Sequence, residues 1–227
     1  MIEVIYEDNN IFAINKPPGL IVYNEKNTKI KERCLSSLLL KEFPVLKGIG
    51  GERGGAVHRL DKDTSGVILF AKNNDTLLYL QKQILEKKAK KEYITLVYKN
   101  VKKNRGVISS FITRSPKDRR KQKAYYGEIG KRRAITFFKV LKRFEKYTLL
   151  KVRIKTGRKH QIRCHLSFIG HPVVGDRLYK FKDNKDPKGV ERQLLHAKLI
   201  KIQTPAEKKC FKTKLPSDFK RILKSLS

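Results

Sequence analysis

The sequence predicts an α+β fold built on a largely antiparallel sheet. Short runs in which every second residue is apolar recur along the chain, and a few separate segments show helical spacing instead. Strands mixed with separate helices are typical of that class. The length of 227 residues suits one domain or two small lobes, and no internal repeat or low-complexity linker divides the chain.

The N-terminal part shows both kinds of pattern. Residues 3–6 and 11–15 are predicted strands joined by a polar turn, and two prolines within residues 16–19 end the second strand. Residues 35–43 predict a short helix that a proline ends. The glycine-rich segment 48–55 predicts a mobile loop.

The rest of the chain continues the alternation. Within residues 148–154, three apolar residues alternate with two cations, so the apolar side chains face one way. The strands expected beyond the glycine-rich loop are residues 66–71, 92–98, 107–112, 135–141, 148–154 and 195–202. The helices expected there are residues 74–88, 158–169 with Gly170 at its C-terminal end, and 217–226 with Ser217 as its cap.

The charge of the chain predicts a polyanionic partner. Lys and Arg number 54 against 21 Asp and Glu, which gives a formal net charge of +33. Nucleic acid and an anionic membrane are the two candidates. The sequence has no long apolar helix and no lipidation signal, so we expect RNA or DNA rather than a membrane.

The cysteines indicate a reduced, cytoplasmic setting. Cys34, Cys164 and Cys210 are odd in number and widely spaced, so neither a disulfide framework nor a zinc site is indicated. The N-terminus does not read as a signal or transit peptide. His160 and His165 are five residues apart, whereas zinc pairs on a helix prefer a spacing of four, so we expect no metal.

The stretch His58-Arg59-Leu60-Asp61-Lys62-Asp63-Thr64-Ser65-Gly66 is the strongest candidate for chemistry. It places Asp61 between two cations, directly before a predicted buried strand. A carboxylate flanked in this way stays ionised and fixed in direction, as a nucleophile or base must be. A surface turn held by ion pairs is the structural alternative. His58 fits a structural role or a chemical one equally well, and Asp63 is expected to be structural.

Two further stretches add to the pattern. Gly157-Arg158-Lys159-His160-Gln161-Ile162-Arg163-Cys164-His165-Leu166 is a predicted helix, on which Arg163 follows the buried Ile162 and can emerge at the rim of a core. The stretch from Lys90 to Val97 is a predicted strand that carries Tyr93. A strand tyrosine half-buried against the core is the structural interpretation of Tyr93, and an aromatic platform for a base is the functional one.

Together these stretches resemble the signature motifs of RluA-type pseudouridine synthases, which isomerise uridine in RNA. The resemblance runs from about residue 11 to residue 205, and the Asp61 and Arg163 stretches are its most specific parts. It implies one catalytic domain, residues 1–227, with a long bent mixed sheet, flanking helices and a central cleft between two lobes. The pattern begins close to Met1, so we expect no separate RNA-binding domain before it.

The resemblance also assigns roles to residues. Asp61 matches the catalytic aspartate, Tyr93 the catalytic tyrosine that stacks on the flipped uracil and serves in proton transfer, and Arg163 the basic residue that orients the aspartate. Arg59 matches the arginine that helps displace the target nucleotide, with a plain phosphate contact as the alternative. Ile162 is expected in the apolar wall beside the uracil. No cofactor is implied, because the reaction is an isomerisation.

A basic run between residues 114 and 123 is expected to contact the RNA backbone rather than to choose the base. Tyr125 and Tyr126 follow it, so cations and stackable aromatics occur together. A solvated loop is the structural alternative. The cations predicted to touch RNA are Arg114, Arg119, Arg120 and Lys121.

The sequence thus predicts a cytoplasmic pseudouridine synthase acting on ribosomal RNA, transfer RNA or both. No obligate protein partner is indicated, and a monomer is expected. Asp61 either attacks the sugar covalently or assists a glycal-type path by removing a sugar proton, and both routes stay open. The alternatives are a non-catalytic RNA-binding or ribosome-assembly factor and, more weakly, a nuclease, which would need clustered metal-binding acids.

Overall fold

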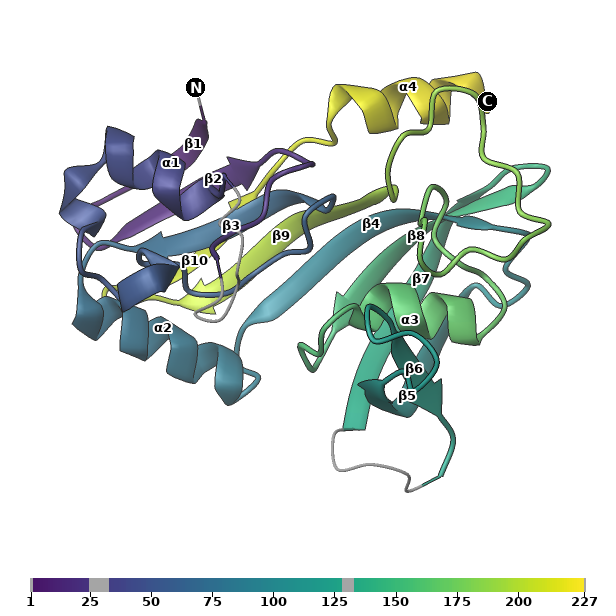
Figure 1. Cartoon of the computed structure of the whole chain (residues 1–227), viewed down its shortest axis with the longest axis horizontal. Coiled ribbons are helices and arrows are strands. Elements are labelled where there is room, and N and C mark those ends of the chain that lie inside the picture. Colours follow the sequence, from purple (N-terminus) through teal and green to yellow (C-terminus); the bar gives the residue numbers. More distant parts are fainter. Residues whose placement is uncertain (1, 25–32, 128–132, 227) are drawn as a thin grey trace. The chain divides into compact units, whose positions relative to one another are not determined.

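The computed structural model describes residues 2–24, 33–127 and 133–226, and it confirms the α+β class (Figure 1). The strands are β1 (Glu3–Glu7), β2 (Ile11–Lys16), β3 (Ser65–Ala71), β4 (Lys90–Tyr98), β5 (Arg105–Arg114), β6 (Gln122–Tyr125), β7 (Arg133–Arg143), β8 (Tyr147–Ile154), β9 (Leu195–Gln203) and β10 (Lys208–Lys212). The helices are α1 (Leu35–Glu42), α2 (Asn74–Leu85), α3 (Gln161–Phe168) and α4 (Ser217–Ser225), with short 3-10 turns at Pro44–Leu46 and Gly51–Arg53.

The chain divides into two compact units. The first unit consists of Met1–Lys90 and Ala197–Lys214, and the second consists of Lys91–His196 and Leu215–Ser227. Each unit therefore contains a segment from a late part of the chain. The resemblance implies two lobes that work together as one catalytic domain, and this stays a prediction.

The first unit is built on antiparallel strands. β2 pairs with β1 on one side and with β3 on the other, and β10 pairs with β9. Every residue of β3 is buried, as are the first four residues of β2. Strands so apolar on both faces need cover on both sides. The helices α1 and α2 flank them in Figure 1, and the ring of Phe43, at the end of α1, packs 4.5 Å from that of Phe12.

The second unit is an antiparallel array of five strands in the order β4, β8, β7, β5 and β6. α3 packs on one face, where Cys164 joins a cluster with Ile112 of β5 and Ala134 of β7. α4 covers the β4–β8 end of the other face, where Phe219 packs with Ile94 and other apolar residues. Alternate residues of each strand therefore face either the side of the sheet that α3 covers or the side on which α4 packs.

Most predicted elements are confirmed, and several boundaries are corrected. The third helix begins at Gln161 rather than at residue 158, because His160 has a left-handed backbone with φ of 53°. Ser217 is the first residue of α4 and not its cap, which is Pro216. The glycine-rich segment is not a plain loop, since it contains the 3-10 turn Gly51–Arg53. Two strands, β6 and β10, were not predicted.

Two further expectations concern the setting of the chain. Among the described residues, no helix is both long enough and apolar enough to cross a membrane. The three cysteines are free thiols, with Cys34 and Cys164 buried and Cys210 exposed. Burial raises the pKa of the Cys164 thiol to about 12, so this thiol stays protonated.

Candidate active site

The segment before Asp61 lies alongside β3 in the first unit. Backbone N–H groups of Val57 and Ala71 donate to Leu69 and Gly55 respectively, at 2.9 and 2.8 Å. His58 extends this pairing, because its Nε2 accepts a hydrogen bond from the Leu69 N–H at 3.3 Å. An accepting nitrogen carries no proton, so the structure gives His58 a structural contact.

Asp61 itself opens a tight turn into β3. The N–H of Thr64 donates to the Asp61 carbonyl at 3.1 Å, and Leu60 just before it is buried with 6% exposure. Asp61 is half-buried. Gly66 follows the turn with φ of +115°, and a Cβ there would lie 2.2 Å from the Ala197 carbonyl oxygen of β9. Only glycine fits this close approach. The turn is therefore held in place by the buried Leu60 before it and by the packing of Gly66 against β9 after it.

Lys16 ties the Asp61 turn to the end of β2. Its side chain is fully buried, and its ammonium donates to three backbone carbonyls: Pro17 at 2.7 Å, Leu20 at 2.6 Å and Lys62 at 2.8 Å. Three acceptors match the three N–H groups of an ammonium. The backbone beside Asp61 is therefore fixed by a buried cation, a role that no sequence motif indicates.

Arg59 lies on an aromatic ring. Its guanidinium carbon is 5.5 Å from the centroid of the Tyr23 ring, and that of Arg53 is 5.7 Å from the same ring. Arg59 is exposed, and a cation–π contact at an exposed site contributes about 0.5–1 kcal/mol. The Tyr23 ring thus favours the side-chain conformation of Arg59 that places the guanidinium over it, among the conformations open to an exposed arginine.

Tyr93 belongs to the second unit. It lies on β4 opposite Val152 of β8, and it is more buried than the structural interpretation predicted, with 7% exposure. Val152 in turn lies opposite Phe138 of β7, so Tyr93 shares a cross-strand row with two other buried apolar side chains. The strand neighbours hold the tyrosine ring in place on this face.

Arg163 is buried on α3 instead of emerging at the rim of the core. Its Nε donates to Oδ2 of Asp176 at 2.6 Å and its Nη2 donates to Oδ1 at 2.9 Å, a bidentate pair. The exposed fractions of the two side chains are only 6% and 0%. The guanidinium also lies over the ring of Tyr179, 5.2 Å from its centroid.

Asp176 accepts more than the guanidinium. The backbone N–H groups of Leu178 and Tyr179 donate to its Oδ1 at 2.9 and 3.1 Å, so the carboxylate is satisfied by both charge and hydrogen bonds. The sequence does not predict this pairing of Asp176 with Arg163. The neighbouring Ile162 is buried with 5% exposure, as expected for an apolar wall.

The two histidines of the α3 stretch have separate partners. His165 is fully buried and bonded to the hydroxyls of Ser110 and Thr136, at 3.0 and 2.8 Å. Burial lowers its pKa to about 4. His160 contacts the Tyr179 hydroxyl through Nδ1 at 3.1 Å. His165 is thus a neutral connector between α3 and the strands β5 and β7.

The basic run is only partly a loop. Arg114 is the last residue of β5 and β6 begins at Gln122, so the run forms a hairpin. Arg119 and Arg120 are exposed and Lys121 is half-buried. Arg120 donates to both carboxylate oxygens of Asp118, at 3.0 and 2.9 Å, and these hydrogen bonds lower the pKa of Asp118 to about 2.

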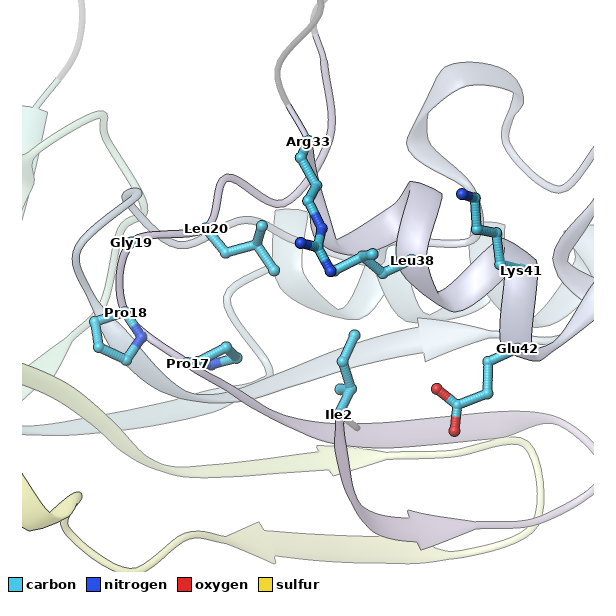
Figure 2. Close-up of a pocket in the computed structure, with 9 residues that line it drawn as sticks. All are labelled: Ile2, Pro17, Pro18, Gly19, Leu20, Arg33, Leu38, Lys41 and Glu42. Carbon is cyan, nitrogen blue, oxygen red and sulfur yellow. The ribbon is translucent and has the colours of Figure 1, made fainter.

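A pocket of about 950 Å³ lies in the first unit (Figure 2). Figure 2 shows Arg33 extending between Leu20 and Leu38. The lining of the pocket combines apolar side chains with two cations and one carboxylate. The residues are Ile2, Pro17, Pro18, Gly19, Leu20, Arg33, Leu38, Lys41 and Glu42. No predicted site residue is in this set, so we place the chemistry at the Asp61 turn.

The predicted site residues are thus divided between the units. Asp61 and Arg59 lie in the first unit, whereas Tyr93, Ile162 and Arg163 lie in the second. The orientation of Asp61 by Arg163 stays a prediction. The structure supplies two partners that had been missed, Lys16 for the Asp61 turn and Asp176 for Arg163.

Comparison with known proteins decides the family. A family model described as RNA pseudouridylate synthase matches residues 10–168, a range that contains Asp61, Tyr93 and Arg163. The chain belongs to the RNA pseudouridylate synthase family. The resemblance drawn from the Asp61 and Arg163 stretches is therefore confirmed.

Similar proteins cover most of this pseudouridylate synthase family member. An uncharacterized RNA pseudouridine synthase of Aquifex aeolicus (strain VF5) is 47% identical over 190 residues, which are 82% of this chain and 58% of the relative. The ribosomal large subunit pseudouridine synthase D of Xylella fastidiosa (strain Temecula1 / ATCC 700964) is 35% identical over 214 residues, 90% of this chain and 62% of the relative. The chain therefore spans about three fifths of the length of these two relatives.

A solved structure agrees with the fold. The human RNA pseudouridylate synthase domain containing 4 matches with a TM-score of 0.79 and 25% sequence identity. The match covers 98% of this chain and 92% of the human one. The α+β architecture derived from the strand patterns is thus that of the family.

Proposed function

We propose that this chain is an RNA pseudouridine synthase that converts specific uridines of ribosomal RNA, transfer RNA or both to pseudouridine. The observation that carries the proposal is the Asp61 turn, in a chain whose family is RNA pseudouridylate synthase. A half-buried carboxylate in the turn that leads into β3, with the neighbouring backbone tied by the buried Lys16, is a rigidly held nucleophile or base.

The reaction needs little besides this carboxylate. The bond between the sugar C1′ and uracil N1 breaks, the base turns, and a bond forms between C1′ and C5. The hydrogen on C5 leaves to solvent as a proton and N1 gains one, so atoms and electrons balance without a cofactor. Asp61 starts the exchange by one of two routes. It attacks C1′, and the bond from Asp61 to C1′ breaks when C5 bonds to C1′, or it removes a sugar proton that returns to the sugar once the base is reattached.

The other site residues support this step. Tyr93 stacks on the flipped uracil, Ile162 forms part of the apolar wall, and Arg163 orients Asp61. Arg59 displaces the target nucleotide from its helix or contacts a phosphate. The exposed cations Arg114, Arg119 and Arg120, with Lys121, contribute affinity for the RNA backbone. The two units would act as one catalytic domain, in the cytoplasm and as a monomer.

The test is release of tritium from RNA labelled at uridine C5. The native protein is expected to release label from ribosomal or transfer RNA, and Asp61→Asn is expected to release none while it still binds RNA. Asp63→Asn makes the same change of charge two residues further on and should keep most of the activity. Matching losses in the two variants would assign the effect to the charge of the turn rather than to Asp61.

A non-catalytic RNA-binding factor is the competing function. It requires binding of both RNAs by the native protein, with no release of label from either. A result of that kind would overturn the proposed function, because the carboxylate would then have no chemistry to perform.

A further inference from the structure

The five-stranded array of the second unit has one face that is open. Along β5, β6, β7 and β8 the even-numbered residues that are buried, such as Ile112, Ala134 and Val152, face α3 or the core. The odd-numbered residues point to the opposite face, because successive side chains of a strand alternate; in β7 this holds up to Lys139, since the register shifts between Val140 and Lys142. None of the odd-numbered residues of these four strands is buried. We call these odd-numbered residues the odd face.

Only one end of the odd face is covered among the described residues. α4 packs against Tyr147 and Leu149 of β8 through the cluster that contains Phe219. Further along, Val107 of β5 is 59% exposed and lies opposite Phe137 of β7. A single exposed apolar side chain is ordinary on a protein surface, so Val107 shows only that this part of the odd face is open to solvent.

The odd face is strongly cationic. Glu92 of β4 lies opposite Arg153 and is the nearest acid in the strand register. The odd-numbered positions of the four strands carry no acidic residue. The cations at these positions include Arg105, Lys123, Arg133, Lys139, Lys151 and Arg153.

Aromatic rings lie among these cations. The guanidinium of Arg153 lies over the ring of Phe137, 4.5 Å from its centroid. The ammonium of Lys123 lies over the ring of Tyr125, 4.9 Å from its centroid, and Tyr125 lies opposite Phe111 in the register. A flat guanidinium supported by a ring offers a base a plane to stack on.

We propose that the odd face binds a single-stranded segment of the RNA substrate. Phosphates would pair with the cations, and bases would stack on the Phe137–Arg153 pair and on Tyr125. Cations interleaved with aromatics on an open sheet match the chemistry of an unpaired RNA strand better than that of an acidic protein, which offers few stackable rings. The inference rests on RNA being the substrate, as proposed above.

The odd face is distinct from the candidate site. Tyr93 lies in a row with Val152 and Phe138, both even-numbered and buried, so it belongs to the other face of the array. The segment bound by the odd face is therefore not the one that carries the target uridine. The same substrate would be held at two places, on opposite faces of one sheet.

A matched pair of variants tests this surface. One removes three cations of the odd face by Lys139→Ser, Lys151→Ser and Arg153→Ser. The other removes three exposed cations of α4, in the same unit, by Lys220→Ser, Arg221→Ser and Lys224→Ser. Both have the same net charge, so a difference between them reports position. Thermal unfolding and circular dichroism confirm that each variant is folded.

The probe is a short oligoadenylate, which contains no uridine and thus does not depend on the reaction. Its dissociation constant, measured over a range of salt concentrations, is expected to rise about tenfold or more for the odd-face variant, with a salt slope lower by about 0.7 for each phosphate that is no longer bound. The α4 variant should change the dissociation constant much less. Equal losses in both variants, or no loss in the odd-face variant, would overturn the proposal.

A single substitution separates stacking from charge. Phe137→Leu removes the ring under Arg153 but no charge, so binding of oligoadenylate should weaken by about fivefold or more with an unchanged salt slope. Undiminished binding by this variant would remove the aromatic part of the proposal. Tritium release is measured in parallel, and a protein that binds oligoadenylate through the odd face but releases no label would contradict the proposed function alone.

Discussion

Lys16 is a buried ammonium whose three N–H groups all donate to backbone carbonyls, one of them in the turn that carries Asp61. Substitution by Met keeps the length and apolar stem of the side chain but leaves three carbonyls without a donor. We expect Lys16→Met to lower the free energy of unfolding by about 1–3 kcal/mol and to reduce tritium release more than RNA binding. Urea unfolding and the two assays check this.

The control for Lys16 is Lys41→Met on α1, where the lysine is exposed. It should leave the free energy of unfolding within about 0.5 kcal/mol of the native value. A Lys16→Met protein that is destabilised but fully active per folded molecule would show that the Asp61 turn does not depend on this clamp.

Variants of the Arg163–Asp176 pair can distinguish a structural role of Arg163 from a role in the reaction. Breaking a buried pair leaves one charge without its partner, so Asp176→Asn should cost about 3–5 kcal/mol of unfolding free energy. Removing the second charge as well, with Arg163→Met added to Asp176→Asn, should restore much of that stability, because the Asn side-chain oxygen can still accept the two backbone N–H groups. Because Arg163 is proposed to orient Asp61, tritium release should stay low in the double variant even when it is folded.

The readout for this pair is activity at a temperature where the variants are equally folded. Recovery of both stability and release in the double variant would mean that Arg163 serves the fold alone. Recovery of stability without release supports its positioning role.

The helix α3 is joined to β5 and β7 by a buried imidazole, that of His165. Burial lowers the pKa of His165 to about 4, whereas a histidine in the unfolded chain titrates near 6.5. The unfolded state therefore binds a proton at a higher pH than the folded state does. Stability is full above about pH 6.5 and falls as the pH drops towards 4, by roughly 3 kcal/mol in total from this group.

Urea unfolding between neutral and mildly acidic pH measures this loss. A His165→Gln variant is expected to be less stable at neutral pH, and its stability should fall less steeply as the pH drops. His171→Gln, at a partly exposed histidine, is the control and should follow the native curve. Parallel curves for the native protein and His165→Gln would assign the acid sensitivity to other groups.

The strands that sequence could predict are those whose own residues alternate. β8 is an example, since its buried residues are all apolar or Thr and its other side chains are polar or half-exposed. β6 and β10 each bury a single residue, Ala124 and Phe211, among polar neighbours. Their strand conformation comes from the partner strands β5 and β9, which no local pattern reveals.

The residues of the candidate site likewise differ in whether a local sequence pattern reveals them. Asp61, Tyr93 and Arg163 are found from motifs, because each motif is continuous in sequence. Lys16 and Asp176 act on distant residues, and their side chains are recognisable only by their buried partners. The only local sign of the role of Lys16 is its position between a predicted strand and two prolines. An ordinary lysine at the end of a strand has the same position.

The net charge of +33 makes the affinity of the protein for RNA depend on the salt concentration. Substituting Arg119 and Lys121 with Ser should weaken binding and lower the slope of log affinity against log salt by roughly 0.7–0.9 for each phosphate that the variant no longer neutralises. Arg120→Ser should have a smaller effect, since Asp118 already engages that guanidinium. Filter binding at several salt concentrations gives the slopes.

An unchanged slope in the Arg119 and Lys121 variant would mean that the β5–β6 hairpin does not touch RNA. An effect of Arg120→Ser as large as that of the other two would mean that RNA displaces Asp118 from its arginine.

The division of the chain also sets an order of events during synthesis. The first unit needs Ala197–Lys214, which leave the ribosome only after the whole segment Lys91–His196 of the second unit. Gly66, beside the Asp61 turn, packs against the backbone of Ala197. The Asp61 turn therefore lacks this contact until residue 197 has been synthesised. The proposed catalytic carboxylate is therefore fixed among the last parts of the protein, and a nascent chain stalled before residue 197 would carry the aspartate without its final support.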